Sequence, residues 1–331
     1  MGKYMSVSLV LIVVLFFWPW LRSEPTEVPA EEEPLQVQEQ EVSSPDGVDE
    51  VRLLRVLVDG VLQEMDMKTY LLGVVRAEMP AAFETEALKA QAVAARTYTR
   101  YKMEQGGSEK HPEADSCDDI NCCKAYMSRE EAAVNWGAEA EAWEEKIRAA
   151  VEATDGECVL YEGRPILAVF HSSSAGETRD AADVWSSSLP YLKSVASPEN
   201  ENSVPNYLSR VTFSAEELKA LLQEALPQAD LSKTPSSWFT NIRQQENGSV
   251  IELDVGGVRV GGNRLRTILG LRSACFSVSF EGAAVTFAVT GYGHGVGMSQ
   301  YGANVLAAEG KTYREILAWY YTGTEVAAYE E

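Results

Sequence analysis

Helical and short-stranded patterns follow one another along residues 51–331 without a regular strand–helix–strand repeat. Apolar residues recur at helical spacing in 67–78, 84–103 and 138–156, whereas much of the later sequence consists of short alternating runs. This order argues against a regularly alternating parallel sheet. We therefore predict an α+β fold of mixed helices and short-stranded antiparallel sheets, forming one compact domain.

The first two helices have clear local signals. Asp66 can cap a helix over 67–78, and Pro80 ends it, so that Met79 should be extended and Glu78 should lie in the last turn. The second helix, 84–103, begins with acidic and ends with basic residues, as the helix dipole favours. Its run of alanines permits close packing against a neighbouring helix.

Turn signals divide the rest of the chain. The polar, turn-rich segment 103–130 precedes the third helix, which we expect to end at Gly156. Glu162-Gly163 and Asn247-Gly248 predict hairpin turns. A capping box at Ser214 to Glu217 predicts a further helix, and NRLRTILGL, SQYGANVLAAEG and TYREILAWYY predict three more.

The first 50 residues differ in kind from the remainder. Lys3 precedes an apolar run ending in aromatics, so we predict a membrane anchor at 1–23, although a cleaved signal peptide is the alternative. Residues 24–50 are acidic, without Lys or Arg, and predict a disordered tether. The expected protein is single-pass in the cell membrane, with an extracytoplasmic domain at 51–331.

Charge and cysteine content restrict the function. The formal net charge of −22 opposes nucleic-acid binding, which needs clustered basic residues, whereas an uncharged or zwitterionic polymer remains a suitable partner. The five cysteines, an odd number, argue against a complete disulfide framework.

Glu78 is a candidate general acid. The negative end of the helix dipole and partial burial would both raise its pKa, as a proton donor at neutral pH requires. By position alone, a solvated glutamate at a helix end is the more common interpretation. On the second helix Lys89 and Arg96 share a face that could hold a substrate or simply be solvated, and Gln91 on the small-residue side needs a polar partner.

The loop HPEADSCDDINCCKAY is a candidate metal site. His111, Cys117 and Cys123 are evenly spaced, Cys122 is adjacent, and imidazole with thiolate ligands suits tetrahedral zinc in a closed structural site. A disulfide from Cys117 to Cys122 or Cys123 is the alternative.

Two further segments, FHSSSAGETRDAADVW and GYGHGVGMSQYGA, place His171 and His294 among small residues that would let a polymer approach the backbone. The glycines do not satisfy the dinucleotide-binding pattern. A structural histidine is the more common interpretation of His171.

Several motifs, in order, resemble the stage II sporulation protein D family, lytic transglycosylases of endospore-forming bacteria. They are GVVRAEMP, FETEALKAQAVAARTY, FHSSSAGETRDAADVW with PYLKSV, GHGVGMSQYGA and YREILAWYYTG. The similarity spans about residues 51–326.

The resemblance implies a role for each candidate residue. Glu78 would be the catalytic acid and base beside a substrate groove. The implied substrate-binding residues are Lys89, Gln91, Arg96, Tyr191 and Lys193, with His171, Ser173 and His294 as weaker candidates. Some members similarly carry a zinc loop, which implies His111, Cys117 and Cys123 as ligands, leaves Cys122 as an extra thiol, and leaves the fourth ligand open.

The resemblance also implies a reaction and a setting. A single carboxyl group would cleave the MurNAc–GlcNAc bond of peptide-free peptidoglycan strands and leave 1,6-anhydro-MurNAc ends, without a cofactor in the chemistry. The implied setting is forespore engulfment, with stage II sporulation proteins P and M as partners. A non-catalytic amidase enhancer that binds peptidoglycan is the alternative, and a zinc amidase is the least favoured hypothesis.

Overall fold

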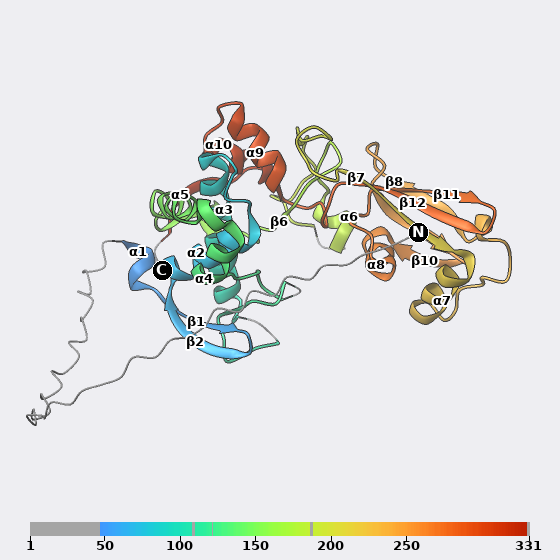
Figure 1. Cartoon of the computed structure of the whole chain (residues 1–331), viewed down its shortest axis with the longest axis horizontal. Coiled ribbons are helices and arrows are strands. Elements are labelled where there is room, and N and C mark those ends of the chain that lie inside the picture. The colour runs from blue at the N-terminus through green and yellow to red at the C-terminus, as the bar shows by residue number, and fades with distance from the viewer. Residues whose placement is uncertain (1–46, 108–109, 121, 186–187, 330–331) are drawn as a thin grey trace, which may run out of the picture. The chain divides into compact units, whose positions relative to one another are not determined.

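The computed structural model in Figure 1 describes residues 47–107, 110–120, 122–185 and 188–329. These residues form a mixed α+β structure with several small, mainly antiparallel sheets, as predicted. They contain two separate hydrophobic cores. The first core carries the candidate acid Glu78, and the second is built largely from strands.

Five helices surround the first core and are grouped together in Figure 1. They are α2 (Met67–Glu78), α3 (Thr85–Glu104), α5 (Ala140–Glu152), α9 (Gln300–Ala308) and α10 (Tyr313–Tyr320). Helix α3 packs against the other four, and its alanines 87, 90, 92, 94 and 95 are buried. Small side chains therefore allow close helix packing at the centre, as the sequence predicted.

Three small sheets lie around this core. The first has the order β2 (Val61–Asp66), β1 (Leu53–Val58) and β3 (Ser116–Cys117), and the second β14 (Glu325–Ala328), β4 (Glu157–Tyr161) and β5 (Arg164–Pro165). The third is the short parallel pair β13 (Met298–Ser299) and β6 (Phe170–His171). Its register, Ser299 opposite His171, brings two distant segments together beside α2.

The second core lies between two antiparallel sheets and two helices. The sheets have the orders β11 (Phe276–Glu281), β12 (Ala284–Thr290), β7 (Leu208–Ser214) and β10 (Val258–Gly261), β9 (Val250–Val255), β8 (Phe239–Gln244). The helices are α7 (Ala215–Ala225) and α8 (Gly262–Leu269). Leu218, Leu265 and Phe287 are fully buried in this core, which the sequence did not distinguish from the first.

The local signals had mixed success. Asp66 accepts the hydrogen bond of the Thr69 amide and caps α2, and the Ser214 capping box begins α7, both as predicted. The hairpin turn at Glu162-Gly163 is confirmed by positive φ angles of 51° and 76°. Helix α4 (Arg129–Trp136) was missed, and α5 ends at Glu152 rather than Gly156. The short helix α6 (Ala181–Trp185) was also not predicted.

The predicted membrane anchor at 1–23, with residues 24–46 of the predicted tether, lies outside the described residues. Across the described ranges given above, no helix is both long and apolar enough to cross a bilayer. This finding contradicts the prediction of a single-pass cell-membrane protein, which is corrected accordingly.

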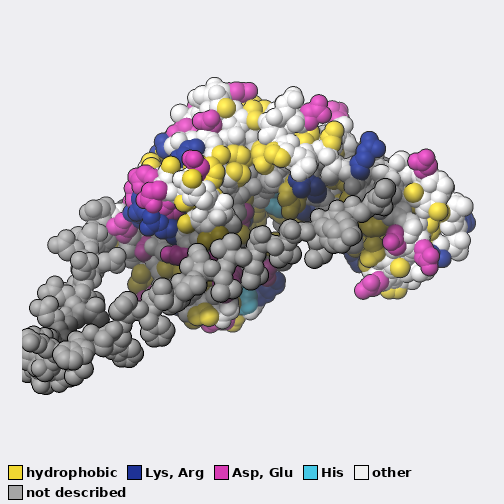
Figure 2. Space-filling view, in the orientation of Figure 1, with side chains coloured by type: hydrophobic (Ala, Val, Ile, Leu, Met, Phe, Trp, Pro, Cys, Tyr) yellow, Lys and Arg dark blue, Asp and Glu magenta, His cyan; other side chains and the backbone are white. Residues whose placement is uncertain are grey.

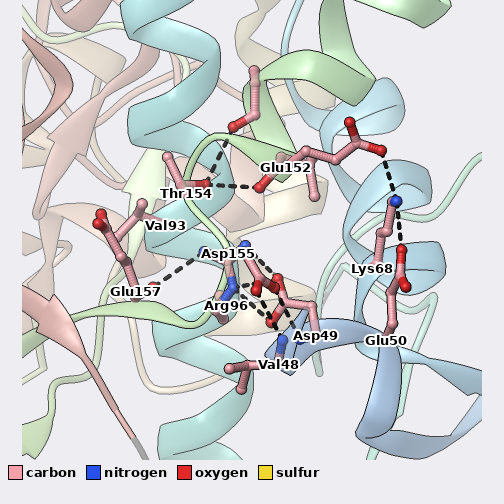
Figure 3. A network of polar contacts seen from close by, with 12 residues as sticks. Val48, Asp49, Glu50, Lys68, Val93, Arg96, Glu152, Thr154, Asp155 and Glu157 are labelled. Carbon is pink, nitrogen blue, oxygen red and sulfur yellow. Dashed lines mark hydrogen bonds and ion pairs between the residues drawn. The ribbon is translucent and has the colours of Figure 1, made fainter. Parts of the chain in front are cut away.

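The folded part begins before residue 51. Helix α1 (Val48–Val51) is fixed by Asp155, whose carboxylate accepts the backbone N–H groups of Val48 and Asp49 at 2.8 and 2.9 Å (Figure 3). Asp49 is 4% exposed and its carboxylate accepts Arg96 Nη2 at 2.6 Å. Residues 47–50 therefore belong to the first core and not to a tether.

Candidate active site

Glu78 is the last residue of α2, and its backbone is fixed on both sides. Met79 is extended, with φ −128° and ψ 134°, as the following Pro80 predicted. The backbone carbonyl of Glu78 accepts Gln300 Nε2 from the first turn of α9 at 2.8 Å. The end of α2 is thus held in place by a residue more than 200 positions away in the sequence.

The Glu78 carboxyl group is partly buried. Burial raises its pKa above the ordinary value of 4.5, while the charge of Lys124 and a hydrogen bond from the Ala125 backbone N–H at 3.1 Å oppose the rise. The group therefore keeps its proton to a higher pH than an exposed glutamate. This is the property that a general acid needs.

Glu78 opens into a cleft of about 640 Å³. The cleft is lined by the end of α2, by Ile120, Cys123 and Lys124 of the metal-candidate loop, and by the segments 170–172 and 292–294. Arg266 of α8 and the start of α9 complete it. Of the described residues that line this cleft, Glu78 is the only carboxylic acid.

Two of the predicted residues, His171 and His294, also line the cleft. The centres of their rings lie 5.5 Å apart, and the ring centre of His294 lies 5.4 Å from that of Trp185. Burial lowers the pKa of His171 to about 4, so this imidazole is neutral at neutral pH. Its Nδ1 lies 3.2 Å from the Val296 carbonyl and its Nε2 2.7 Å from Ser174 Oγ, which suits an Nδ1–H tautomer.

The pKa of His294 is lowered well below its ordinary value by burial, and the nearby positive charges act in the same direction. Its Nδ1 accepts the Val296 backbone N–H at 3.1 Å, which leaves Nε2 as the ring's proton-bearing nitrogen. Both imidazoles are therefore neutral, and their ring nitrogens bond to protein groups, those of His171 to Val296 and Ser174 and those of His294 to the backbone of Val296 and Phe170.

The glycines around His294 pack against protein rather than leaving space for a polymer. Gly293, Gly295 and Gly297 have φ angles of 121°, 82° and 71°. A Cβ atom at Gly293 would lie 2.6 Å from His171 Cβ, and one at Gly297 would lie 2.1 Å from the Val169 carbonyl oxygen. Their lack of side chains permits the close approach of two backbone segments behind the cleft.

Gln91 and Ser173 lie next to the cleft lining. Gln91 is fully buried, and its Oε1 accepts Gln300 Nε2 at 3.4 Å, which links it to the Glu78 carbonyl. The Gln91 Nε2 and the Ser173 Oγ are both buried without a hydrogen-bond partner among the described residues. The polar partner expected for Gln91 is thus present at its side-chain oxygen but not at its side-chain nitrogen.

The other four predicted substrate-binding residues lie outside the cleft lining. Arg96 is 1% exposed and paired with Asp49, and Lys89 pairs with Glu86 at 2.7 Å. Tyr191 accepts the Leu167 amide at 3.3 Å beside a different pocket, and Lys193 pairs with Asp180 at 3.1 Å. For Arg96 the structure shows an internal ion pair instead of a substrate contact.

The candidate metal loop brings its donors together. His111, Cys117 and Cys122 each offer a ligand atom, and these atoms lie within 4.8 Å of one another. Cys123 Sγ lies 3.6 Å from Cys122 Sγ, close to the edge of about 3.8 Å expected between two sulfurs of a tetrahedral zinc site with Zn–S bonds of about 2.3 Å. The donor set therefore fits zinc. Cys122, expected only as an extra thiol, lies in the cluster with His111 and Cys117.

The disulfide alternative is not supported, because Cys117 is a free thiol and both proposed pairings require it. Burial raises the pKa of the Cys117 thiol. A buried thiol without an electrostatic partner resists ionisation, whereas a bound metal would favour the thiolate.

The sequence analysis missed Lys124, which is a prominent side chain of the cleft. It is 9% exposed, and its Nζ lies 4.1 Å from the ring centre of Tyr98 and 3.8 Å from that of Phe170. Burial lowers its pKa to about 8. Its position directly after two candidate ligands was a usable signal for the metal loop, whereas only the fold brings that loop beside Glu78.

Comparisons with known proteins agree with this arrangement. Residues 59–161 match the SpoIID family, described as stage II sporulation protein. The chain is 39% identical over 267 residues to stage II sporulation protein D of Bacillus subtilis (strain 168), covering 80% of this chain and 76% of that protein. For stage II sporulation protein D of Bacillus amyloliquefaciens the identity is 36% over 271 residues, covering 80% and 75%.

A more distant relative has a different name. The chain is 28% identical over 317 residues to the amidase enhancer of Bacillus subtilis (strain 168), covering 78% of this chain and 40% of that protein. Together with the cleft, these matches define a cell-wall protein of sporulation. The chain belongs to the stage II sporulation protein D family, which confirms the resemblance found in the sequence.

Proposed function

We propose that this protein is a peptidoglycan lytic transglycosylase with Glu78 as its single general acid and base. The observation that carries the proposal is the charge inventory of the cleft, where Glu78 is the only acid among the described lining residues. A hydrolase ordinarily uses two carboxyl groups, about 5–9.5 Å apart, to activate water or to form a covalent intermediate. One acid with a raised pKa suits a reaction in which the sugar supplies its own nucleophile.

The proposed reaction needs one proton, which returns to its donor. The Glu78 carboxylic acid protonates the glycosidic oxygen of the MurNAc–GlcNAc bond as that bond breaks. The C6 hydroxyl of the same muramic acid residue then attacks the anomeric carbon, and the Glu78 carboxylate accepts the hydroxyl proton. The products are a 1,6-anhydro-MurNAc end and a free GlcNAc hydroxyl group, and Glu78 is again protonated.

The neutral histidines of the cleft support this chemistry. At neutral pH His171 and His294 carry no charge, because burial depresses both pKa values. They therefore form part of the cleft wall without adding a positive charge that would stabilise the ionised form of Glu78. The substrate we propose is a peptidoglycan glycan strand, processed during forespore engulfment together with stage II sporulation proteins P and M.

We also propose that the loop at 111–123 binds a structural zinc ion. His111, Cys117, Cys122 and Cys123 would hold it. The support is the clustering of three donor atoms within 4.8 Å and the 3.6 Å separation of the adjacent sulfurs. Ala125, two residues beyond this loop, donates its backbone N–H to Glu78, so that closure round a metal ion would fix the hydrogen bond to the acid.

A second candidate function is a non-catalytic enhancer of an amidase, which the similarity to the Bacillus subtilis amidase enhancer favours. Product analysis separates the two candidates. The full chain is incubated with purified glycan strands, and the products are identified by mass spectrometry. We expect 1,6-anhydro ends, which reducing ends or an absence of cleavage would contradict.

Two variants make this experiment specific to Glu78. Glu78→Gln should lower the rate by roughly 10²- to 10⁴-fold, as the loss of a general acid does. Its fold should be intact, because the folded protein disfavours the charged form of this carboxyl group. Glu84→Gln, which changes an exposed acid outside the cleft lining, is the matched control and should retain activity.

A further inference from the structure

The cleft is basic although the chain is strongly acidic. The formal net charge of the chain is −22, and acidic side chains are spread across the face shown in Figure 2. The described lining of the cleft nevertheless contains three cations, Arg76, Lys124 and Arg266, against the one acid Glu78. An excess of positive charge at this place indicates a ligand with negative charge.

Two of the three cations are available to a ligand. Arg76 is neutralised by Glu144, which accepts both its Nε at 2.8 Å and its Nη2 at 2.5 Å. Lys124 and Arg266 have no ion pair with any residue in the described ranges. Arg266 Nε donates to the backbone carbonyls of residues 271 and 272, which orients the guanidinium group and leaves its Nη atoms for another acceptor.

Lys124 is built into the wall rather than lying loosely on the surface. Its side chain is 9% exposed, the rings of Tyr98 and Phe170 flank its ammonium group, and this group makes no hydrogen bond with a described residue. Glu78 attracts this ammonium group through the cleft, but no carboxylate among the described residues lies within ion-pair distance of it, and keeping a buried lysine without such a contact costs free energy. A ligand carboxylate that completes its hydrogen bonds would offset that cost.

We propose that Lys124 and Arg266 bind the lactyl carboxylate of muramic acid at the cleft, which rests on the glycan-cleaving function proposed above. Muramic acid carries this carboxylate as a free anion only when its stem peptide has been removed, because the peptide is attached there through a neutral amide. The two cations would therefore favour strands without stem peptides by recognising a charge. They would also place the muramic acid, whose C6 hydroxyl is the nucleophile, next to Glu78.

The test measures binding separately from cleavage. The full chain carrying Glu78→Gln is titrated calorimetrically with peptide-free glycan strands and with the same strands after methyl esterification of their carboxyl groups. We expect the free-acid strands to bind about 10- to 100-fold more tightly, as charge-assisted hydrogen bonds allow. Equal affinity for the two strands would overturn the proposal.

Variants in the same background assign the preference to residues. Lys124→Met and Arg266→Gln should each reduce the preference for free-acid strands, with little change for the esterified strands. Arg264→Gln, on the same helix as Arg266 but outside the cleft lining, should keep the preference. Lys124→Arg keeps the positive charge, so it should retain much of the preference and distinguish loss of charge from loss of packing.

The outcomes separate this inference from the proposed function. A preference unchanged in Lys124→Met and Arg266→Gln, or an equal loss of affinity for both strands in the folded variants, would overturn the carboxylate site. A clear preference in Glu78→Gln, combined with no anhydro ends from the wild-type chain, would refute the transglycosylase activity and leave the carboxylate site supported.

Discussion

The Arg96–Asp49 ion pair allows a strong test, because the family resemblance implied that Arg96 binds substrate and the structure places it inside the first core. Arg96 donates through Nε and Nη2 to the Asp49 carboxylate, and through Nη1 to the Glu157 carbonyl at 3.1 Å (Figure 3). The Arg96 and Asp49 side chains are only 2% and 6% exposed. Arg96→Met therefore leaves a buried carboxylate without its partner.

Removing one partner of a buried ion pair costs about 3–5 kcal/mol, a large part of the roughly 5–15 kcal/mol that stabilises a typical domain. For a domain of this size, that loss lowers the thermal midpoint by roughly 6–20 °C. A chain that begins at Val51 lacks Asp49 and should lose a similar amount, whereas a chain that begins at Ser43 should not.

Urea unfolding followed by circular dichroism measures these free energies. Lys102→Met, on the same helix and without an ion pair among the described residues, is the control. The double variant Asp49→Ala with Arg96→Met should cost less than the sum of the two single changes, because both remove the same pair. If Arg96→Met unfolds within about 1 kcal/mol of wild type and instead weakens glycan binding, the structural assignment is refuted.

Three other measurements follow from the structure. Because burial raises the pKa of Glu78, kcat/KM should decline as the pH rises through that raised pKa, which lies above 4.5, and a profile that rises there would contradict the role of Glu78 as an acid. Gly73→Ala should cost about 1–3 kcal/mol in urea unfolding, since its Cβ would lie 2.1 Å from the Tyr126 ring. Gly261→Ala controls for packing, because its φ is −70° and its Cβ would meet no atom closer than 3.8 Å. Zinc should copurify with the chain and be absent from Cys117→Ser, as metal analysis by mass spectrometry can check; a metal-free wild type would end the zinc proposal.

The parts of the fold predicted from the sequence were those fixed by neighbouring residues. The bounds of α2 followed from Asp66 and Pro80, and the hairpin at Glu162-Gly163 followed from a polar residue and a glycine between two strand-like runs. Helix α4 carried an equally local signal, the capping box from Ser128 to Glu131. This box lies at the end of segment 103–130, for which turns were predicted. A capping box therefore indicates a helix start here even though the sequence before it is polar.

The candidate site was less accessible, because its contacts join distant segments. Nothing near Glu78 in sequence indicates that Gln300 donates to its carbonyl, or that Arg266 shares its cleft. Similarly, the seven-residue spacing of Lys89 and Arg96 placed both residues on one face of the helix, but it did not indicate which residues cover that face. Asp49 covers Arg96, and it lies in a segment whose composition predicted disorder.

The packed glycines behind His294 have a consequence for how this sequence can change over time. Gly293, Gly295 and Gly297 combine positive φ angles with contacts that leave no space for a methyl group. A saturation library over 291–297 should therefore recover fewer functional variants at these three positions than at the exposed Tyr292, which directly precedes Gly293. Drift in this segment is limited by backbone geometry, independently of which polymer the cleft accepts.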